Sequence, residues 1–266
     1  MSAAENSGGG GADAGGPSEE ERRKKAEKPQ QDSLELHALY RGKRETVPKC
    51  VVRDLSDFSL WSSPGVAGPC KAIEDSPEKV YDYTNKWNTV AVVSDGSRVL
   101  GLGDIGPKAG LPVMEGKALL YRYQGGVDSV PIVLDTKDPD EIIRTVLLLQ
   151  PTFGGINLED ISHPKCFRIL ETLRQQAEIP VWHDDQQGTA TVTLAGVLNA
   201  LRIVDKNIGD ARIAFIGAGA ANVACARLIF GRGADPGNCT VVDSRGMLGN
   251  HREDIAKRRT EYPEKW

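Results

Sequence analysis

The chain has 266 residues, of which 39% are hydrophobic and 26% are charged, and its formal net charge is −4. This composition is that of a globular protein, so it excludes wholesale disorder and fibrous proteins. No apolar run approaches the roughly 20 residues that a membrane helix needs, and the mildly acidic balance lacks the basic footprint of a nucleic-acid-binding protein. The five cysteines never fall in CxxC spacing, which argues against a zinc site or a disulfide framework and predicts a cytoplasmic protein.

The first 32 residues form a tail by composition. Residues 1–17 are rich in Gly, Ala and Ser and have nothing with which to build a core. Ser18 and Glu21 make a capping-box pattern, and the acidic residues that follow Ser18 meet basic residues four positions later. This pattern predicts one or two turns of exposed helix. We interpret residues 1–32 as a disordered, solvated tail, with a docking arm as the alternative.

From residue 89 onward the sequence alternates β-rich and helical segments. Strands are predicted at residues 89–93, 98–102, 130–134, 155–158, 179–182, 212–216 and 239–242. Helices are predicted after a cap at Asp138 or Asp140 and at residues 166–177, 189–204 and 220–230. Strands separated by helices predict right-handed βαβ units on a largely parallel sheet, so the fold class is α/β.

A glycine-rich turn follows the predicted strand that ends at Ile216. Its residues are Gly217, Ala218, Gly219, Ala220, Ala221 and Asn222. The first glycine permits a tight turn, the second lets the backbone approach a pyrophosphate, and the following helix offers its N-terminal N–H groups to phosphates. Asn222 departs from the dinucleotide fingerprint, which has Gly or Ala at that position.

The end of the next predicted strand supports this dinucleotide site. Asp243 stands there, where an acidic residue binds ribose hydroxyls. A purely structural turn is the alternative, and the strand context favours the dinucleotide. Asp243 favours NAD and Arg245 suits the 2′-phosphate of NADP, so the choice between the two cofactors stays open.

Carboxylates follow two strands of the predicted sheet. Glu159 and Asp160 come after one strand, and Asp184 and Asp185 come after another. The carboxyl ends of parallel strands meet at the edge where ligands bind. Converging carboxylates repel one another, and Mg²⁺ or Mn²⁺ would neutralise them. Spacing alone does not exclude that these acids only cap the helices after them. The adjacent His183 is not counted among the candidate ligands, since a lone histidine is more often structural than a metal ligand.

A series of motifs in chain order carries a family resemblance. They are SPGVA at 63–67, SDG at 94–96, VLGLGDIGP at 99–107, PVMEGK at 112–117, FGGINLED at 153–160, HDDQQGTA at 183–190 and GAGAA at 217–221. Together they resemble the short prokaryotic malic enzymes (oxaloacetate-decarboxylating malate dehydrogenases) over about residues 35–260. The resemblance implies a substrate and metal domain over residues 33–187 and a Rossmann-type dinucleotide-binding domain over residues 188–266.

The resemblance also implies a reaction and its cofactors. Malic enzymes convert L-malate to pyruvate and CO₂ by oxidative decarboxylation, with NAD or NADP as the hydride acceptor. Mg²⁺ or Mn²⁺ is required, and the family forms homodimers or larger oligomers. The partners expected here are therefore the small molecules malate, oxaloacetate and pyruvate and further copies of the chain, with no nucleic acid and no membrane.

The resemblance assigns roles to individual residues. Lys117 matches the catalytic lysine, the base that removes the proton of the C2 hydroxyl, and this role requires that burial or nearby cations depress its pKa. Asp184 matches a neighbouring catalytic residue that orients the site. Arg98 lies where some members hold a substrate carboxylate, a task that suits the planar guanidinium; an exposed arginine on a strand is the alternative. The residues that match the metal ligands are Glu159, Asp160 and Asp185.

Two features depart from the family pattern. The family motif places a tyrosine before Thr/Ser-Pro-Gly-Val-Ala, and this tyrosine protonates the enol of pyruvate. Ser62 stands at that position. A serine hydroxyl is a weaker acid with a shorter reach, so we expect enol protonation to be slowed by roughly 10²–10⁴-fold unless another donor substitutes. The chain also stops soon after the second strand of the dinucleotide domain, so we interpret it as the N-terminal portion of a malic enzyme with an incomplete Rossmann domain.

Two other functions stay open. A metal-dependent oxaloacetate decarboxylase needs only the cation and the substrate anchors, and CO₂ release without a nicotinamide cofactor would support it. An inactive partner subunit of an intact malic enzyme would fit Ser62, the incomplete domain and the charged tail. Finding the chain only in mixed oligomers would support that function.

Overall fold

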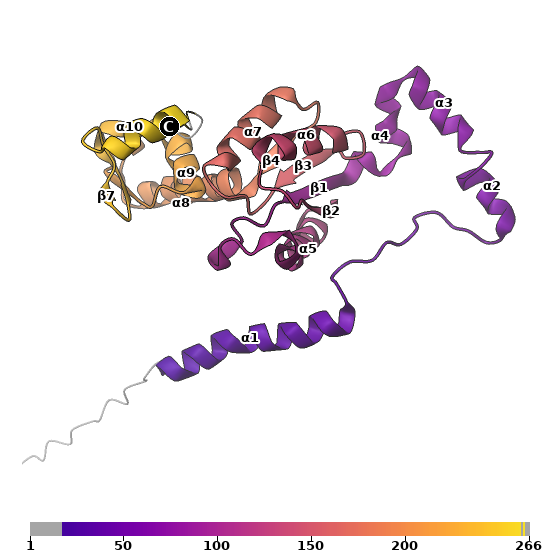
Figure 1. The fold of residues 1–266 in the computed structure, drawn as a ribbon, viewed down its shortest axis with the longest axis horizontal. Coiled ribbons are helices and arrows are strands. Elements are labelled where there is room, and N and C mark those ends of the chain that lie inside the picture. Colours follow the sequence, from indigo (N-terminus) through magenta and orange to yellow (C-terminus); the bar gives the residue numbers. More distant parts are fainter. Residues whose placement is uncertain (1–17, 262, 264–266) are drawn as a thin grey trace, which may run out of the picture. The chain divides into compact units, whose positions relative to one another are not determined.

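The computed structural model describes residues 18–261 and residue 263. The chain divides into two compact units, Met1–Lys43 and Arg44–Trp266. The first unit contains helix α1 (Glu19–Tyr40), which is 22 residues long and so extends well beyond the one or two turns expected at its start (Figure 1). It ends where Arg41 adopts a left-handed φ and Gly42 follows, a common helix stop. Residues 1–17 of the predicted tail lie outside the described residues.

The second unit is built around a four-stranded parallel sheet. Its strands are β1 (Thr89–Ser94), β2 (Asp128–Val133), β3 (Gly155–Leu158) and β4 (Val181–His183), in the order β2-β1-β3-β4. Each neighbouring pair is parallel. The predicted strands at 89–93, 130–134, 155–158 and 179–182 are thus confirmed, with small shifts at their ends. This is the predicted α/β fold.

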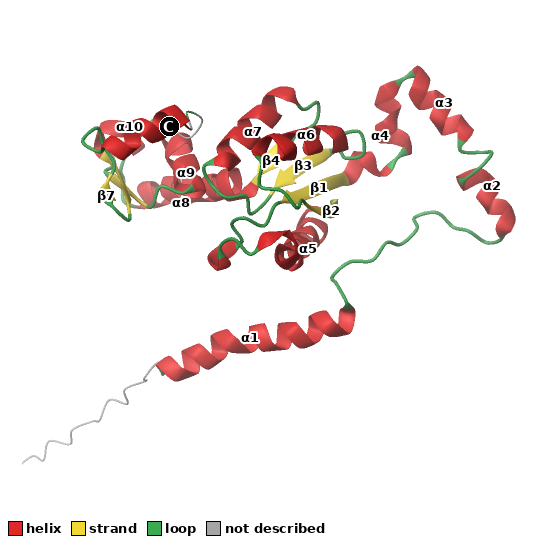
Figure 2. Cartoon of the chain, in the orientation of Figure 1, coloured by secondary structure: helices red, strands yellow, loops and turns green. Residues whose placement is uncertain are grey.

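Helices cover both faces of this sheet. Helix α5 (Gly106–Gly125) lies on one face, and α6 (Pro139–Leu149) and α7 (Lys165–Gln176) lie on the other (Figure 2). The core below α6 and α7 contains Ile142 and Phe167, both almost completely buried. The side chain of Asp138 accepts a hydrogen bond from the Asp140 N–H at 2.8 Å, which confirms the predicted cap of α6.

Two segments differ from the prediction. Residues 98–102 are not a strand, because Leu100 and Gly103 both adopt positive φ and fold the segment into a tight turn. Helix α5 was not predicted, since Gly and Pro inside its sequence lower helix propensity. Pro107 stands in the first turn of this helix, where its missing N–H costs nothing. Packing of α5 against β2 and β1 outweighs the weak local preference.

A smaller sheet follows in the chain. Strands β5 (Ile213–Ile216) and β6 (Cys239–Asp243) are parallel, and the short β7 (Gly246–Met247) pairs antiparallel with β6. Helices α8 (Thr189–Ile203) and α9 (Ala220–Gly231) confirm the predictions at 189–204 and 220–230. Five elements were not expected from the sequence, namely β7, α10 (Glu253–Glu261) and the short helices α2 (Phe58–Trp61), α3 (Ala67–Asp75) and α4 (Val80–Tyr83).

None of the helices within residues 18–261 is long and apolar enough to cross a membrane. The domain boundaries expected at residues 32–33 and 187–188 stay predictions.

Candidate active site

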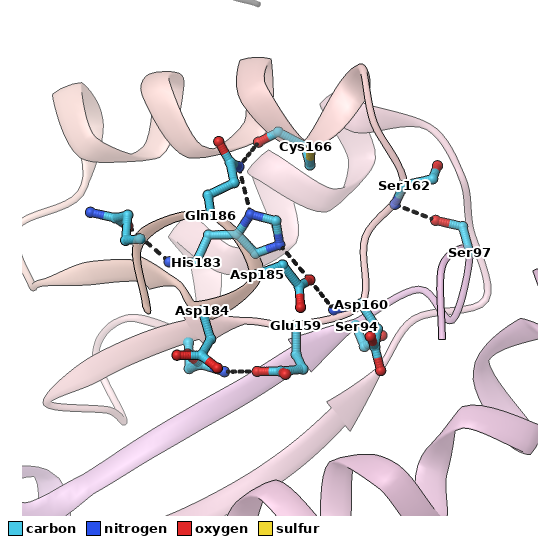
Figure 3. Close-up of polar contacts among 12 residues, drawn as sticks. Ser94, Ser97, Glu159, Asp160, Ser162, Cys166, His183, Asp184, Asp185 and Gln186 are labelled. Atoms are coloured by element: carbon cyan, nitrogen blue, oxygen red, sulfur yellow. Dashed lines mark hydrogen bonds and ion pairs between the residues drawn. The ribbon is translucent and has the colours of Figure 1, made fainter. Parts of the chain in front are cut away.

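The carboxylates after β3 and β4 meet at one edge of the sheet. Glu159 and Asp160 follow β3 directly, and Asp184 and Asp185 open the π-helical turn Asp184–Gly188 after β4. Because β3 and β4 are adjacent and parallel, their carboxyl ends lie side by side (Figure 3). Glu159, Asp160 and Asp185 each offer one ligand atom within 4.8 Å of the other two. The structure therefore shows the predicted convergence.

Burial makes this cluster electrostatically costly. Burial raises the pKa of Glu159 to about 7, and the nearby charge of Asp185 adds to the rise while Lys117 opposes it. Burial and then the charge of Asp185 raise the pKa of Asp160 to about 6. Both carboxyl groups ionise less readily than usual, so a bound cation would stabilise their charged forms.

The donor set fits a hard divalent cation. All the donor atoms are carboxylate oxygens, which Mg²⁺ and Mn²⁺ prefer. The Oδ2 atom of Asp160 is buried and has no hydrogen-bond partner among the described residues. Asp160 also has a positive φ of 53°, which is unfavourable for a non-glycine residue. Backbone hydrogen bonds hold it there, from the Asp160 N–H to Asp185 Oδ2 at 2.9 Å and from the Arg98 N–H to Asp160 O at 3.0 Å.

Lys117 extends from α5 into the same cluster. Its Nζ donates to Asp184 Oδ2 at 2.7 Å and lies 3.0 Å from Glu159 Oε1. Partial burial alone would lower the pKa of Lys117, but the hydrogen bond to Asp184 and the charge of Glu159 outweigh it and raise this pKa above its ordinary value. The same hydrogen bond holds the pKa of Asp184 below its ordinary value, against the effect of burial. The depressed pKa that base catalysis requires is therefore absent in the chain alone.

Gly188 makes room for the side chain of Asp184. A Cβ at Gly188 would lie 2.2 Å from Asp184 Oδ1. We expect Gly188→Ala to displace this carboxylate from Lys117 and to lower the catalytic rate by roughly tenfold or more, as small misplacements in active sites do. The melting temperature should change little, because the displaced atoms end a flexible side chain.

A matched glycine serves as the control for this prediction. A Cβ at Gly196 on α8 would meet no atom within 4 Å, so Gly196→Ala is expected to keep full activity. Steady-state kinetics and thermal melting of both variants check the prediction. Full activity of Gly188→Ala would contradict the role given to Asp184.

Arg98 lies beside the cluster, in the turn that replaces the expected strand. Its backbone N–H is bonded to the carbonyl oxygen of Asp160. Its side chain is exposed and forms no ion pair with any residue in the described part of the chain. The guanidinium is therefore available to an anionic group, and substrate binding by Arg98 stays a prediction.

Ser62 is not brought to the cluster by the described chain. It is exposed at the end of α2, and its backbone hydrogen bonds reach only Phe58 and Val66. Tyr121 is a phenol that the sequence analysis missed. It lies one helical turn after Lys117 on α5, and burial and then the charges of Asp184 and Glu159 raise its pKa. The spacing of four residues would have revealed it only if α5 had been predicted.

The glycine-rich turn forms one wall of a cavity of about 550 Å³. Gly217 has a φ of +102°, which a glycine adopts without strain. Asn222 Nδ2 donates to Ile216 O at 2.7 Å and to Gly217 O at 3.1 Å, so this departure from the fingerprint closes the turn with side-chain hydrogen bonds. Ala220, Ala221 and Asn222 form the first turn of α9. The cavity is lined by His163, Ile216, Gly217, Ala218, Gly219, Val242, Asp243, Ser244 and Arg245.

Asp243 is held in place at this cavity by a residue that the sequence analysis missed. Arg252 donates to both of its carboxylate oxygens, at 2.7 and 3.1 Å. The Arg245 N–H donates to Asp243 Oδ1 at 2.8 Å, and the Arg245 side chain turns to Asp254 at 3.3 Å. Both predicted cofactor residues thus lie at the cavity, and the choice between NAD and NADP stays open.

The comparisons with known proteins agree with this geometry. Residues 41–174 match the family model for the malic enzyme N-terminal domain, and residues 186–266 match the model for the malic enzyme NAD binding domain. The chain is 53% identical over 213 residues to an NAD-dependent malic enzyme of Geobacillus stearothermophilus, with 80% of this chain and 44% of that protein covered. It is 47% identical over 235 residues to an NADP-dependent malic enzyme of Escherichia coli, with 88% and 31% covered.

A solved structure is similar over nearly the whole chain. The crystal structure of Entamoeba histolytica malic enzyme superimposes with a TM-score of 0.86 and 48% identity, with 91% of this chain and 51% of that chain covered. The chain thus spans about half or less of the length of these relatives. On the family-model matches and these similarities, the chain belongs to the malic enzyme family.

Proposed function

We propose that the protein carries out the oxidative decarboxylation of L-malate to pyruvate and CO₂ with NAD or NADP and a divalent cation. The observation that carries this proposal is the convergence of Glu159, Asp160 and Asp185 within 4.8 Å, with Lys117 only 3.0 Å from Glu159. The relatives named NAD-dependent and NADP-dependent malic enzymes support it.

Lys117 acts as the base that accepts the proton of the malate C2 hydroxyl. Glu159, Asp160 and Asp185 would hold Mg²⁺ or Mn²⁺, which would supply the positive charge that polarises the C2 oxygen. With a cation bound, Glu159 would stabilise protonated Lys117 less, and the pKa of Lys117 would fall toward the range of a base. Asp184 keeps the Lys117 Nζ in place through its 2.7 Å hydrogen bond.

Other residues bind the substrate and the cofactor. Arg98 pairs with a malate carboxylate, and Ser62 stands at the position of the acid that protonates the enol. The glycine-rich turn and the N-terminus of α9 would hold the pyrophosphate of NAD or NADP, which would supply the hydride acceptor. Asp243 and Arg245 lie where the adenosine ribose is recognised.

The assay for this proposal is malate-dependent reduction of NAD and of NADP in the presence of Mn²⁺. Pyruvate and CO₂ are expected to form in equal amounts with the reduced cofactor, and chelation of the metal by EDTA should stop the reaction. Oxidation of malate without CO₂ release would contradict the proposal. CO₂ release from oxaloacetate without any malate oxidation would favour the decarboxylase alternative.

The affinity for Mn²⁺ is expected to depend on pH. Below about pH 6, both Glu159 and Asp160 carry protons that the ion must displace, because burial raises the pKa of these groups to about 7 and about 6. The association constant should therefore increase with pH and level off above about pH 7. Calorimetric titrations from about pH 5 to about pH 8 check this.

Glu159→Gln provides the control for the pH dependence. This variant lacks the group with the higher pKa, so its weaker binding should level off nearer pH 6, where Asp160 ionises. An affinity that stays constant over the whole range would contradict the assignment of these carboxyl groups as ligands.

The proposal includes a homodimer or larger homo-oligomer in the cytoplasm, as the family resemblance and the scattered cysteines imply. Sedimentation of the purified protein checks the oligomeric state. A monomer at all concentrations would contradict it.

A further inference from the structure

A chain of buried polar groups lies behind Asp185. His183 is completely buried at the end of β4, and Gln186 is 3% exposed in the turn that follows. Figure 3 shows the His183 ring between Gln186 on one side and Asp185 on the other. Gln186 in turn contacts the backbone carbonyl of Cys166 on α7. Because these side chains are buried, the orientation of one determines which hydrogen bonds its neighbour can form.

The backbone carbonyl of Cys166 determines which groups donate and which accept in this series of hydrogen bonds. A backbone carbonyl only accepts, so the atom of Gln186 that lies 3.3 Å from Cys166 O is the amide nitrogen. The same nitrogen lies 2.5 Å from His183 Nδ1, and it donates its second proton there. His183 Nδ1 is therefore an acceptor, and the ring proton of neutral His183 is on Nε2.

The Nε2 of His183 faces the carboxylate of Asp185. It lies 3.1 Å from Asp185 Oδ2. The contact is not aligned as a full hydrogen bond, and Nε2 has no hydrogen bond to any other residue that the structure describes. Oδ2 also accepts the Asp160 N–H at 2.9 Å. Oδ2 thus accepts one backbone hydrogen bond and has His183 Nε2 close by, and Oδ1 is the oxygen without these two neighbours.

We propose that His183, held in one tautomer by Gln186, is a positioning residue for the metal ligand Asp185. Its Nε2–H fixes the rotation of the carboxylate so that Oδ1 stays available to a divalent cation. This inference rests on the proposed divalent site. Side chains that orient metal ligands in this way typically contribute roughly 10–100-fold to metal affinity.

Three variants and a control test the proposal through Mn²⁺ binding, measured by electron paramagnetic resonance without substrate or cofactor. His183→Phe fills the space and lacks the N–H, and we expect it to bind Mn²⁺ roughly 10–100-fold more weakly. His183→Gln restores an N–H near the position of Nε2 and should recover most of the affinity. Gln186→Met removes the amide that holds His183 in one tautomer, and we expect an intermediate loss of Mn²⁺ affinity.

Gln187→Met is the matched control within the same turn. Gln187 Oε1 accepts the backbone N–H of His183 at 2.9 Å and has no bond to the ring. We expect this variant to bind Mn²⁺ like the wild type. If Gln187→Met and His183→Phe lose Mn²⁺ affinity equally, the turn has only a structural role and the proposal is overturned. Wild-type Mn²⁺ affinity in His183→Phe would also overturn it.

If His183→Phe does not fold, ¹⁵N NMR of the histidine rings in the native protein carries the test, with protonated Nε2 expected in His183 and protonated Nδ1 overturning the proposal. Wild-type protein that binds no Mn²⁺ would overturn the divalent site as well. Wild-type protein that binds Mn²⁺ alongside an unaffected His183→Phe would overturn the positioning role alone.

Discussion

Replacing Lys117 by methionine is expected to lower kcat for malate oxidation by roughly 10²–10⁴-fold, the usual contribution of a general base. Methionine nearly matches the length of the lysine and lacks the amine that lies 2.7 Å from Asp184 and 3.0 Å from Glu159. Mn²⁺ affinity should hold or increase, because Glu159 loses the ammonium group that competes for its charge. Steady-state kinetics and a Mn²⁺ titration of the same preparation measure both effects.

Lys108→Met is the control for this substitution. Lys108 is also on α5, is exposed, and forms no ion pair within residues 18–261, so the variant should keep full activity. Activity of Lys117→Met within a few-fold of the wild type would exclude Lys117 as the base. Loss of Mn²⁺ binding together with activity would instead indicate that the substitution had disturbed the carboxylate cluster.

Replacing Ser62 by tyrosine is expected to raise kcat, by up to roughly 10²–10⁴-fold if enol protonation limits turnover. A phenol is a stronger acid than an aliphatic hydroxyl and reaches further. Ser62 is exposed at the end of α2, so the larger side chain should not disturb folding. Ser62→Phe adds the same ring without the acid and should give no gain. The kcat values of the two variants, measured side by side, separate acidity from bulk.

An unchanged kcat in Ser62→Tyr would show that residue 62 does not limit turnover, either because enol protonation is not the slow step or because another group donates the proton. Tyr121 is then the first residue to test, because its hydroxyl lies within the electrostatic influence of Asp184 and Glu159. In that case Tyr121→Phe should lower kcat in the wild type. If Ser62→Tyr does raise kcat, Tyr121→Phe in that background should have little effect.

Much of the sheet could be predicted from the sequence, because strands and helices alternate with clear hydrophobic patterns. Parallel pairing predicts that Glu159 and Asp185 lie at one edge of the sheet, and they converge there. Helix α5 could not be found in this way, since its glycines and prolines obscure the pattern and packing on β2 decides its conformation. The position of Lys117 beside Asp184 therefore followed only from the structure.

The residues that hold the site residues in place could not be predicted from their spacing in the sequence. Arg252 reaches Asp243 from a segment after β7, and His183 meets Gln186 only because the residues after β4 form a π-helical turn. Each is a contact between side chains that local propensity does not specify. Because a lone histidine is more often structural than a metal ligand, no role was expected of His183, which is completely buried and lies 3.1 Å from Asp185.

Crystals of the protein soaked in Mn²⁺ and measured at the manganese absorption edge test the central claim most directly. We predict one anomalous peak at the carboxyl edge of the larger sheet, with oxygen ligands from Glu159, Asp160 and Asp185 and with Lys117 Nζ nearby. A crystal in which that edge stays without manganese, or in which manganese is bound by other residues, would contradict the proposed active site.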